Sequence, residues 1–460
     1  MRRLTAIRER ALWCSRIYDS ESMNGVQIWQ LLWPLLLDQF FMRILGILNT
    51  TMISSYGPEA VSAVSVIESL NMFLTNFFFA IATGCTVVVA QYCGRNERRT
   101  AMEAAAQAVS VSVLTAVLVS GIICVFPAPI INLLFGEADP LMREYAENYM
   151  LGSAVSYPFF ALIQTILGAM RGSSDAKPAV VYSTALNLLN LLGNALFLSV
   201  FRFGVFGLSL AVVLSRAIIT VPAILYLARR EGGICAKAFF RLNLGLQRSI
   251  IYIAAPTGLE QVFFHAGRIL TQVFIVGYGT MSAAANAITL PFSFIIQTAG
   301  MTIQTGIVTI VGRCIGAGDI KAAKRYIKIM TVTGFAASLL LSLIFAPILP
   351  WFLSIYNLPQ EAYGIAFTTS ILILAGIPFT WPGSFIIASG LRAAGDAAYT
   401  SIVSLICMWA VRVGLGYYLG TTLGYGLHGI WIAMFLEWIV RSIIFALRAK
   451  GDKWTRHKVI

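Results

Sequence analysis

Long hydrophobic stretches, separated by short polar segments, follow one another along the whole chain. Each is longer than the roughly 20 residues that cross a bilayer as a helix. Backbone polar groups in lipid must be satisfied within their own segment, which favours helices over strands. The pattern therefore predicts an all-α integral membrane protein with twelve transmembrane helices, at residues 26–54, 61–91, 101–126, 144–170, 178–201, 205–228, 248–276, 284–312, 322–349, 362–390, 398–420 and 426–447.

The sequence also repeats itself at a fixed offset. "PLLLDQ" begins at Pro34 and "PTGLEQ" at Pro256, 222 residues later (256 − 34 = 222). Thr83-Gly84 and Thr305-Gly306 keep that offset. With a slip of one residue, "MRGSSDAKP" at 170–178 aligns with "LRAAGDAAY" at 391–399, two motifs that we expect in short cytoplasmic turns. Several matches in one order at one offset indicate an internal duplication.

The duplication sets the expected domain organisation. Six helices per copy is an even number, so both copies enter the membrane from the same side and form parallel repeats. We expect two six-helix lobes around a central cleft. The expected boundaries are a cytoplasmic N-terminal segment at 1–24, an N-lobe at 25–228, a cytoplasmic linker at 229–247, a C-lobe at 248–449 and a cytoplasmic tail at 450–460.

Charge changes this picture little, although the formal net charge is +13. Most Lys and Arg lie in alternate loops and at the two termini, while the other loops hold Arg143 and Arg202. This is the positive-inside distribution, so we expect both termini in the cytoplasm and the chain in the inner (plasma) membrane. The basic charge then reflects topology and contact with membrane lipids rather than nucleic-acid binding.

Two acidic residues inside predicted spans are the first candidates for function. Asp38 and Glu260 each lie about twelve residues into a span, near the expected midplane, where a charge is costly and usually functional. Pro34 and Pro256 precede them by four residues, and each should kink its helix and free a carbonyl. Such a carboxylate can carry a proton, bind Na⁺ or attract an organic cation. Alternatively, each acid is held in a structural ion pair, in which case Arg268 or Arg412 could reach Glu260.

Other polar residues in spans have structural explanations beside functional ones. Glu437 and Arg441 are four residues apart, the favourable order for a pair within one helix. Arg412 is expected to be a partner for an acid of the second lobe. Asn190 and Asn194, with Asn187, form one stripe that either joins helices through amide hydrogen bonds or lines a cavity.

Several longer stretches resemble the MATE family, the multidrug and toxic compound extrusion transporters. They are "PTGLEQVFFHAGRILTQ" at 256–272, "SGLRAAGDAAYTSIVS" at 389–404, and "MWAVRVGLGYYLG" with "GLHGIWIAMFLEWIVR" within 408–441. The resemblance implies efflux of cationic amphipathic compounds, driven by Na⁺ or H⁺, through a V-shaped cleft and without ATP. The family's acid in the seventh span matches Glu260. Two first-lobe positions that are Asp in many members look like Asn49 and Asn194 here, which leaves Asp38 as the central acid of the first span.

We therefore predict a secondary active multidrug transporter that works by alternating access, as a monomer and with no cofactor. Glu260 is the candidate Na⁺ ligand, and Asp38, Arg412, Asn49, Asn190 and Asn194 are further candidates for binding the coupling ion or the substrate. The alternative is a flippase for lipid-linked oligosaccharides, whose phosphate would need converging arginines from the set Arg43, Arg216, Arg268 and Arg412. An enzyme is not expected, because the sequence has no GxSxG, HExxH or phosphate-binding loop.

Overall fold

The computed structural model describes residues 24–53, 58–136, 139–229, 243–457 and 459–460. Most of the predicted N-terminal segment 1–24 and most of the predicted linker 229–247 lie outside this range. The side chains of 43–53, Asn49 and Arg43 among them, are also outside what the structure describes.

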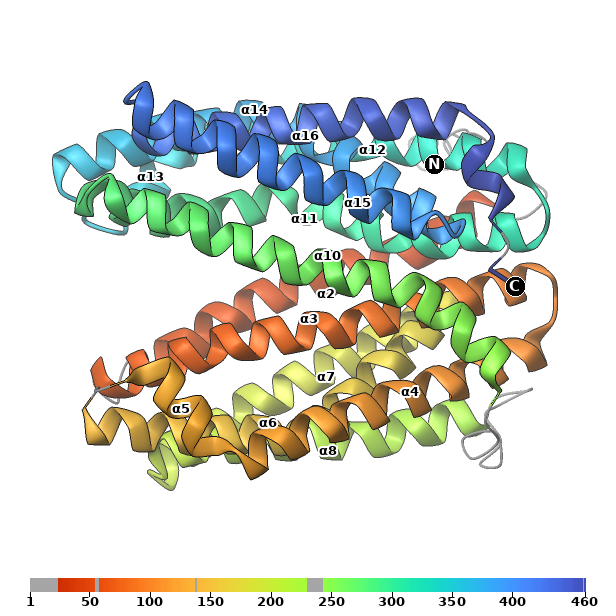
Figure 1. The fold of residues 1–460 in the computed structure, drawn as a ribbon, viewed down its shortest axis with the longest axis horizontal. Coiled ribbons are helices and arrows are strands. Elements are labelled where there is room, and N and C mark those ends of the chain that lie inside the picture. Colours follow the sequence, from red (N-terminus) through yellow and green to blue (C-terminus); the bar gives the residue numbers. More distant parts are fainter. Residues whose placement is uncertain (1–23, 54–57, 137–138, 230–242, 458) are drawn as a thin grey trace, which may run out of the picture. The chain divides into compact units, whose positions relative to one another are not determined.

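Nearly all described residues are helical, and each predicted span coincides with one helix or with one run of consecutive helical segments (Figure 1). The first repeat contains α2 (Gly25–Ile53), α3 (Pro58–Gly94), α4 (Arg98–Val125), α5 (Pro127–Phe135), α6 (Pro140–Gly172), α7 (Ala176–Asn194), η2 (Ala195–Val200) and α8 (Gly204–Arg229). The second contains α10 (Leu244–Gly277), α11 (Thr280–Gly316), α12 (Ile320–Phe345), α13 (Leu349–Ser354), α14 (Gln360–Ala393), α15 (Ala397–Cys407), η3 (Met408–Leu415), η4 (Tyr418–Thr422), α16 (Gly426–Lys450) and, after it, η5 (Lys453–Arg456).

Ten segments of the described chain are long and apolar enough to cross a membrane. The remaining two predicted spans are α2 and α10, the helices that carry Asp38 and Glu260. Both have ample length, at 29 and 34 residues.

The repeats share features that hydropathy did not predict. A short helix follows the third long helix in both, as α5 and as α13, and each has a proline in its first turn. The fifth helix of both continues as π-helix, through η2 in one repeat and through η3 and η4 in the other. Single π-helical turns inside helices are frequent at functional sites.

The chain forms two compact units. The N unit is Trp33–Gly258 with Ile460, and the C unit is Met1–Leu32 with Leu259–Val459. Inside the N unit, α6 packs against α3, α4 and α8; inside the C unit, α14 packs in the same way against α11, α12 and α16. Both divisions fall inside a helix, next to Pro34 in α2 and next to Pro256 in α10.

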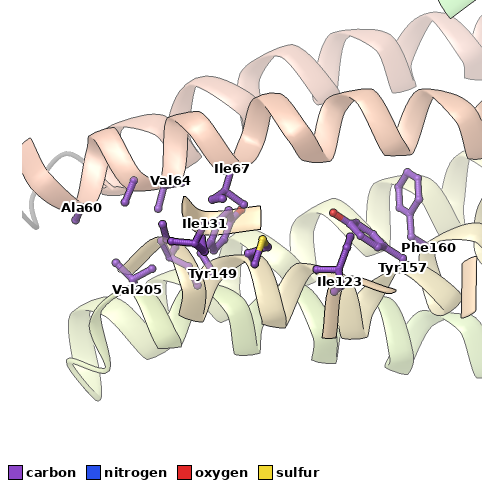
Figure 2. Packing of buried hydrophobic residues seen from close by; sticks show 14 of the residues in the cluster. Ala60, Val64, Ile67, Ile123, Ile131, Tyr149, Tyr157, Phe160 and Val205 are labelled. Atoms are coloured by element: carbon purple, nitrogen blue, oxygen red, sulfur yellow. The ribbon is translucent and has the colours of Figure 1, made fainter. Parts of the chain in front are cut away.

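Buried apolar side chains hold each unit together, as Figure 2 shows for the N unit. Ala60, Val64 and Ile67 of α3 pack there with Ile123 of α4, Ile131 of α5 and Val205 of α8. The rings of Tyr149 and Tyr157 from α6 belong to the same cluster. This core fixes the position of α6, whose last turn carries Arg171.

Candidate functional site

Glu260 lies on α10 and is held by two other helices of the C unit. Arg392, in the last turn of α14, donates from Nη2 to both carboxylate oxygens, at 2.8 Å and 2.7 Å. Ser401 of α15 donates its hydroxyl to Oε2 at 2.9 Å. Arg392 also donates from Nε to Thr400 Oγ1 at 3.1 Å, which orients the guanidinium. Glu260 is therefore a buried carboxylate, 5% exposed, that already has a cationic partner.

The identity of that partner corrects one of our expectations. From the sequence, Arg268 or Arg412 is the expected partner of Glu260, and Arg392 is expected in a cytoplasmic turn. The helix instead continues to Ala393, which brings Arg392 to the carboxylate. The signal that could have found it was the repeat itself, because the aligned motifs place an arginine at this position in both copies.

Asp38 has the same kind of surroundings in the N unit. Ser183 of α7 makes a side-chain hydrogen bond with its carboxylate, and Arg171, in the last turn of α6, interacts with it electrostatically. Within the described residues, Asp38 Oδ1 is buried without a hydrogen-bond partner. Each repeat thus brings together an acid of its first helix, an arginine from the end of its fourth and a serine of its fifth.

A pocket of about 290 Å³ opens beside Glu260 in the C unit. Its aromatic lining consists of Phe264, Phe294, Trp381, Phe385 and Trp438. Its charged lining consists of Glu260, Arg268, Arg392 and Arg412. Gln261, Ser293, Gln297 and Gln304 add neutral hydrogen-bonding groups. Apolar walls with a few polar groups are typical of small-molecule sites, and this pocket is at the lower end of their size range.

Arg412 belongs to a second, more deeply buried ion-pair group in the same unit. Its Nε donates to Glu437 Oε2 at 2.7 Å, and Arg441 donates from Nη1 to Glu437 Oε1 at 3.0 Å. Arg441 also lies over the ring of Phe385, at 4.7 Å from its centroid. The four-residue spacing correctly predicted the Glu437–Arg441 pair, and Arg412 does have an acidic partner in the second repeat.

The asparagine stripe on α7 makes a modest set of contacts. Asn194 donates to Asn190 Oδ1 at 3.3 Å, and Asn190 donates to Ser215 Oγ of α8 at 3.5 Å. The stripe therefore joins α7 to α8 through an amide hydrogen bond, which was the structural one of its two interpretations. Its role in binding an ion or a substrate stays a prediction, as does that of Asn49, whose side chain is not described.

Glu68 on α3 lies near the outer end of its predicted span, where the sequence favours an interfacial acid, and the structure gives it hydrogen-bond partners. Its Oε1 accepts hydrogen bonds from the Tyr149 hydroxyl and from Asn71 Nδ2. Asn71 in turn accepts a hydrogen bond from Tyr157 at 2.5 Å. Figure 2 shows the two tyrosines within the apolar cluster. Aromatic side chains there combine packing with hydrogen bonding, and hydropathy alone cannot distinguish the two roles.

No group of three or more His, Cys, Asp or Glu side chains that could hold a metal ion occurs within the described residues. At Glu260, Arg392 occupies both carboxylate oxygens, the ligand type that a hard cation such as Na⁺ would need. A Na⁺ ion at this carboxylate would therefore compete with Arg392 for the same two oxygens.

Comparison with known proteins agrees with this architecture. The model of the MatE family matches the chain twice, over residues 34–196 and 256–418. The two matches start and end 222 residues apart (256 − 34 and 418 − 196), which confirms the duplication and its offset.

Individual relatives match over almost the full length. An uncharacterized transporter, YisQ of Bacillus subtilis, is 27% identical over 97% of this chain and 98% of its own. A probable multidrug resistance protein, NorM of Thermotoga maritima, is 22% identical, over 93% and 92% of the two chains. A solved structure described as the outward-facing conformation of a multidrug resistance MATE family transporter has a TM-score of 0.85 at 17% identity, over 95% and 97% of the chains. That structural likeness establishes the fold.

Proposed function

Since the chain belongs to the MatE family, it is a membrane transporter and not an enzyme, and we propose that it exports amphipathic organic compounds, cations among them, in exchange for Na⁺ or H⁺. The relatives named as multidrug resistance proteins support a broad substrate range. The observation that carries the exchange mechanism is the buried Glu260, which lines the pocket while Arg392 and Ser401 hold it.

The geometry supports a competition for one carboxylate. Glu260 has two oxygens, and Arg392 Nη2 shares its hydrogen bonding between both. A proton or Na⁺ that reaches Glu260 from the pocket neutralises the carboxylate. The ion pair with Arg392 is then weakened, and Arg392 is released from α10. Because Arg392 ends α14 and Glu260 lies on α10, the exchange would loosen one helix from another. Such a local change can bias a transporter between its two access states.

Asp38 is the counterpart that we propose for the N unit. Its acid, arginine and serine repeat the arrangement around Glu260, although aspartate is shorter by one methylene group. The positions expected for the family's first-lobe acids are Asn49 and Asn194 in this chain. We therefore assign the titrating or ion-binding carboxylate of this unit to Asp38.

The test compares Glu260→Gln and Asp38→Asn with the parent in proteoliposomes, with Na⁺ and pH gradients imposed separately and ethidium as substrate. We expect Glu260→Gln to lower gradient-driven export at least about tenfold, because a hydrogen bond to a charged group typically contributes roughly 1.5–3 kcal/mol. Glu361→Gln is the matched control, since Glu361 is an exposed acid in the first turn of α14. Export by Glu260→Gln at the parental rate would show that this carboxylate does not couple transport.

A flippase for lipid-linked oligosaccharides is the second candidate, because Arg268, Arg392 and Arg412 line one pocket. Arg216 does not join them, since it donates to Ser156 and lies over Phe160 in the N unit. Movement of an undecaprenyl-phosphate-linked glycan across the same proteoliposome membrane, with no ethidium export in either gradient, would favour this candidate over drug efflux.

We further propose that the chain lies in the cell's inner membrane with both termini in the cytoplasm, as the loop charges indicate. A reporter that fluoresces only in the cytoplasm should then fluoresce when fused after Ile460, and a reporter enzyme that works only outside should be inactive there. A reporter inserted next to Arg202, in a loop of the opposite class, should behave in the reverse way. The opposite pattern at both positions would invert the proposed topology.

A further inference from the structure

The charges around the pocket of the C unit do not balance. Four charged side chains line it, of which Glu260 is negative and Arg268, Arg392 and Arg412 are positive. Arg392 is paired with Glu260, and Arg412 is paired with Glu437. Glu437 also binds Arg441, so one carboxylate there serves two guanidinium groups.

Arg268 remains as a positive charge that faces the pocket. Within the part of the chain that the structure describes, no carboxylate lies at salt-bridge distance from it. Arginine stays charged under all physiological conditions, so deprotonation cannot relieve this charge. A cation in a membrane protein normally pairs with an anion or a carbonyl, because its desolvation is costly. The pocket therefore has one guanidinium available for an anionic group.

The position of Arg268 separates it from the coupling carboxylate. It lies eight residues after Glu260 on α10, which is about 12 Å along a helix axis. A group bound by Arg268 would therefore not displace Arg392 from Glu260. The pocket can hold an anionic group at one level while the coupling ion binds at another.

Aromatic side chains indicate what carries the anionic group. Phe264, Phe294 and Trp438 line the same pocket as Arg268. Trp381 and Phe385 line the pocket as well and stack on each other with centroids 4.6 Å apart. Planar aromatic ligands fit such surfaces, and a guanidinium binds carboxylate or phosphate through two parallel hydrogen bonds.

We propose that Arg268 binds the acidic group of an aromatic anion, so that aromatic anions are transported as well as cations. This assignment rests on the proposed transport function for its physiological meaning, but the binding site itself can be tested without transport.

The probes are fluorescein and rhodamine 123, which share a xanthene ring system and differ in charge. Binding of each dye to the purified full chain in detergent is followed by fluorescence polarisation at one fixed pH. We expect Arg268→Gln to weaken fluorescein binding at least about tenfold, the size typical of a hydrogen bond to a charged group. Arg268→Lys should bind fluorescein with an affinity between those of the parent and Arg268→Gln, because lysine keeps the positive charge but cannot donate two parallel hydrogen bonds. Arg98→Gln is the control, since Arg98 is exposed at the start of α4 in the N unit.

Export of both dyes from proteoliposomes is measured in parallel, under each gradient, as dye retained after filtration and lysis at that pH. Loss of fluorescein export in Arg268→Gln with rhodamine 123 export retained supports the proposal. Equal loss of both dyes would make Arg268 a general structural residue and overturn it. Fluorescein binding that is no tighter for the parent than for Arg268→Gln overturns it whatever the transport result. If the parent exports neither dye but binds fluorescein through Arg268, the transport function fails and the anion site stands.

Discussion

Glu260 and Glu437 are both carboxylates bound by arginine in the same unit, yet their surroundings assign them different roles. Glu260 lines the pocket and accepts hydrogen bonds from one arginine and one serine. Glu437 is 0% exposed and binds Arg412 and Arg441 at once. A carboxylate enclosed by two cations has no room for an exchanging ion. We therefore interpret Glu437 as the structural acid and Glu260 as the functional one.

This difference predicts opposite phenotypes. Glu437→Gln leaves two buried guanidinium groups without a counter-charge, which should lower the free energy of unfolding by about 3–5 kcal/mol. Its thermal unfolding in detergent, followed by intrinsic fluorescence, should therefore occur well below that of the parent. Glu260→Gln should unfold closer to the parent while its transport fails. If Glu437→Gln melts with the parent, the buried triad is not a stabilising element.

At the scale of elements, the first helix of each repeat packs across the division between repeats. Leu32 of α2 lies against Gly306 of α11, and Ile250 with Ala254 of α10 lies against Gly84 of α3. Gly84 and Gly306 occupy equivalent positions, 222 residues apart (306 − 84). Each contact lies within one compact unit, which explains why the unit boundaries fall inside α2 and α10.

The two glycines form a matched pair for substitution by alanine. A Cβ on Gly84 would lie 2.7 Å from the backbone oxygen of Ile250, which cannot move without its helix. A Cβ on Gly306 would lie 2.4 Å from Leu32 Cδ2, the end of a flexible side chain. Both substitutions gain the same helix propensity. We therefore expect Gly84→Ala to cost about 1–3 kcal/mol of stability and Gly306→Ala less.

Thermal unfolding of the two alanine variants, side by side, checks this order. Equal melting temperatures, or a lower melting temperature for Gly306→Ala, would mean that the close approach of α10 to α3 does not restrict the side chain at position 84.

At the scale of the whole molecule, neither half of the chain contains a complete compact unit. The N unit needs residues 244–258 of the second repeat, and the C unit needs the beginning of α2. A chain cut between residues 235 and 236 should therefore give two halves that are unstable alone. When co-expressed, they should co-purify through a tag on one half, with the uncut tagged chain as reference. A half that purifies alone and melts like the parent would contradict the shared-helix arrangement.

How far the sequence predicted the site depends on the kind of interaction. Glu260 was found because an acid in an apolar span is unusual, and the Glu437–Arg441 pair followed from helical spacing. Arg392 was missed as the partner because it lies 132 residues away in the chain. The sequence favours an interfacial position for Glu68 and does not predict its hydrogen-bond group for the same reason, since Tyr149 and Tyr157 come from another helix.

The sequence by itself determined the long apolar helices and the twofold repeat, because these depend on local hydropathy and on spacing along one chain. The equivalence of Asp38 and Glu260 was readable in the same way. Only the tertiary structure decided which arginine each acid meets, which charges remain unpaired around the pocket, and which unit each half of α2 and α10 joins. Those outcomes depend on how helices distant in sequence pack together, and a periodic pattern of apolar residues does not specify the partner of any one polar side chain.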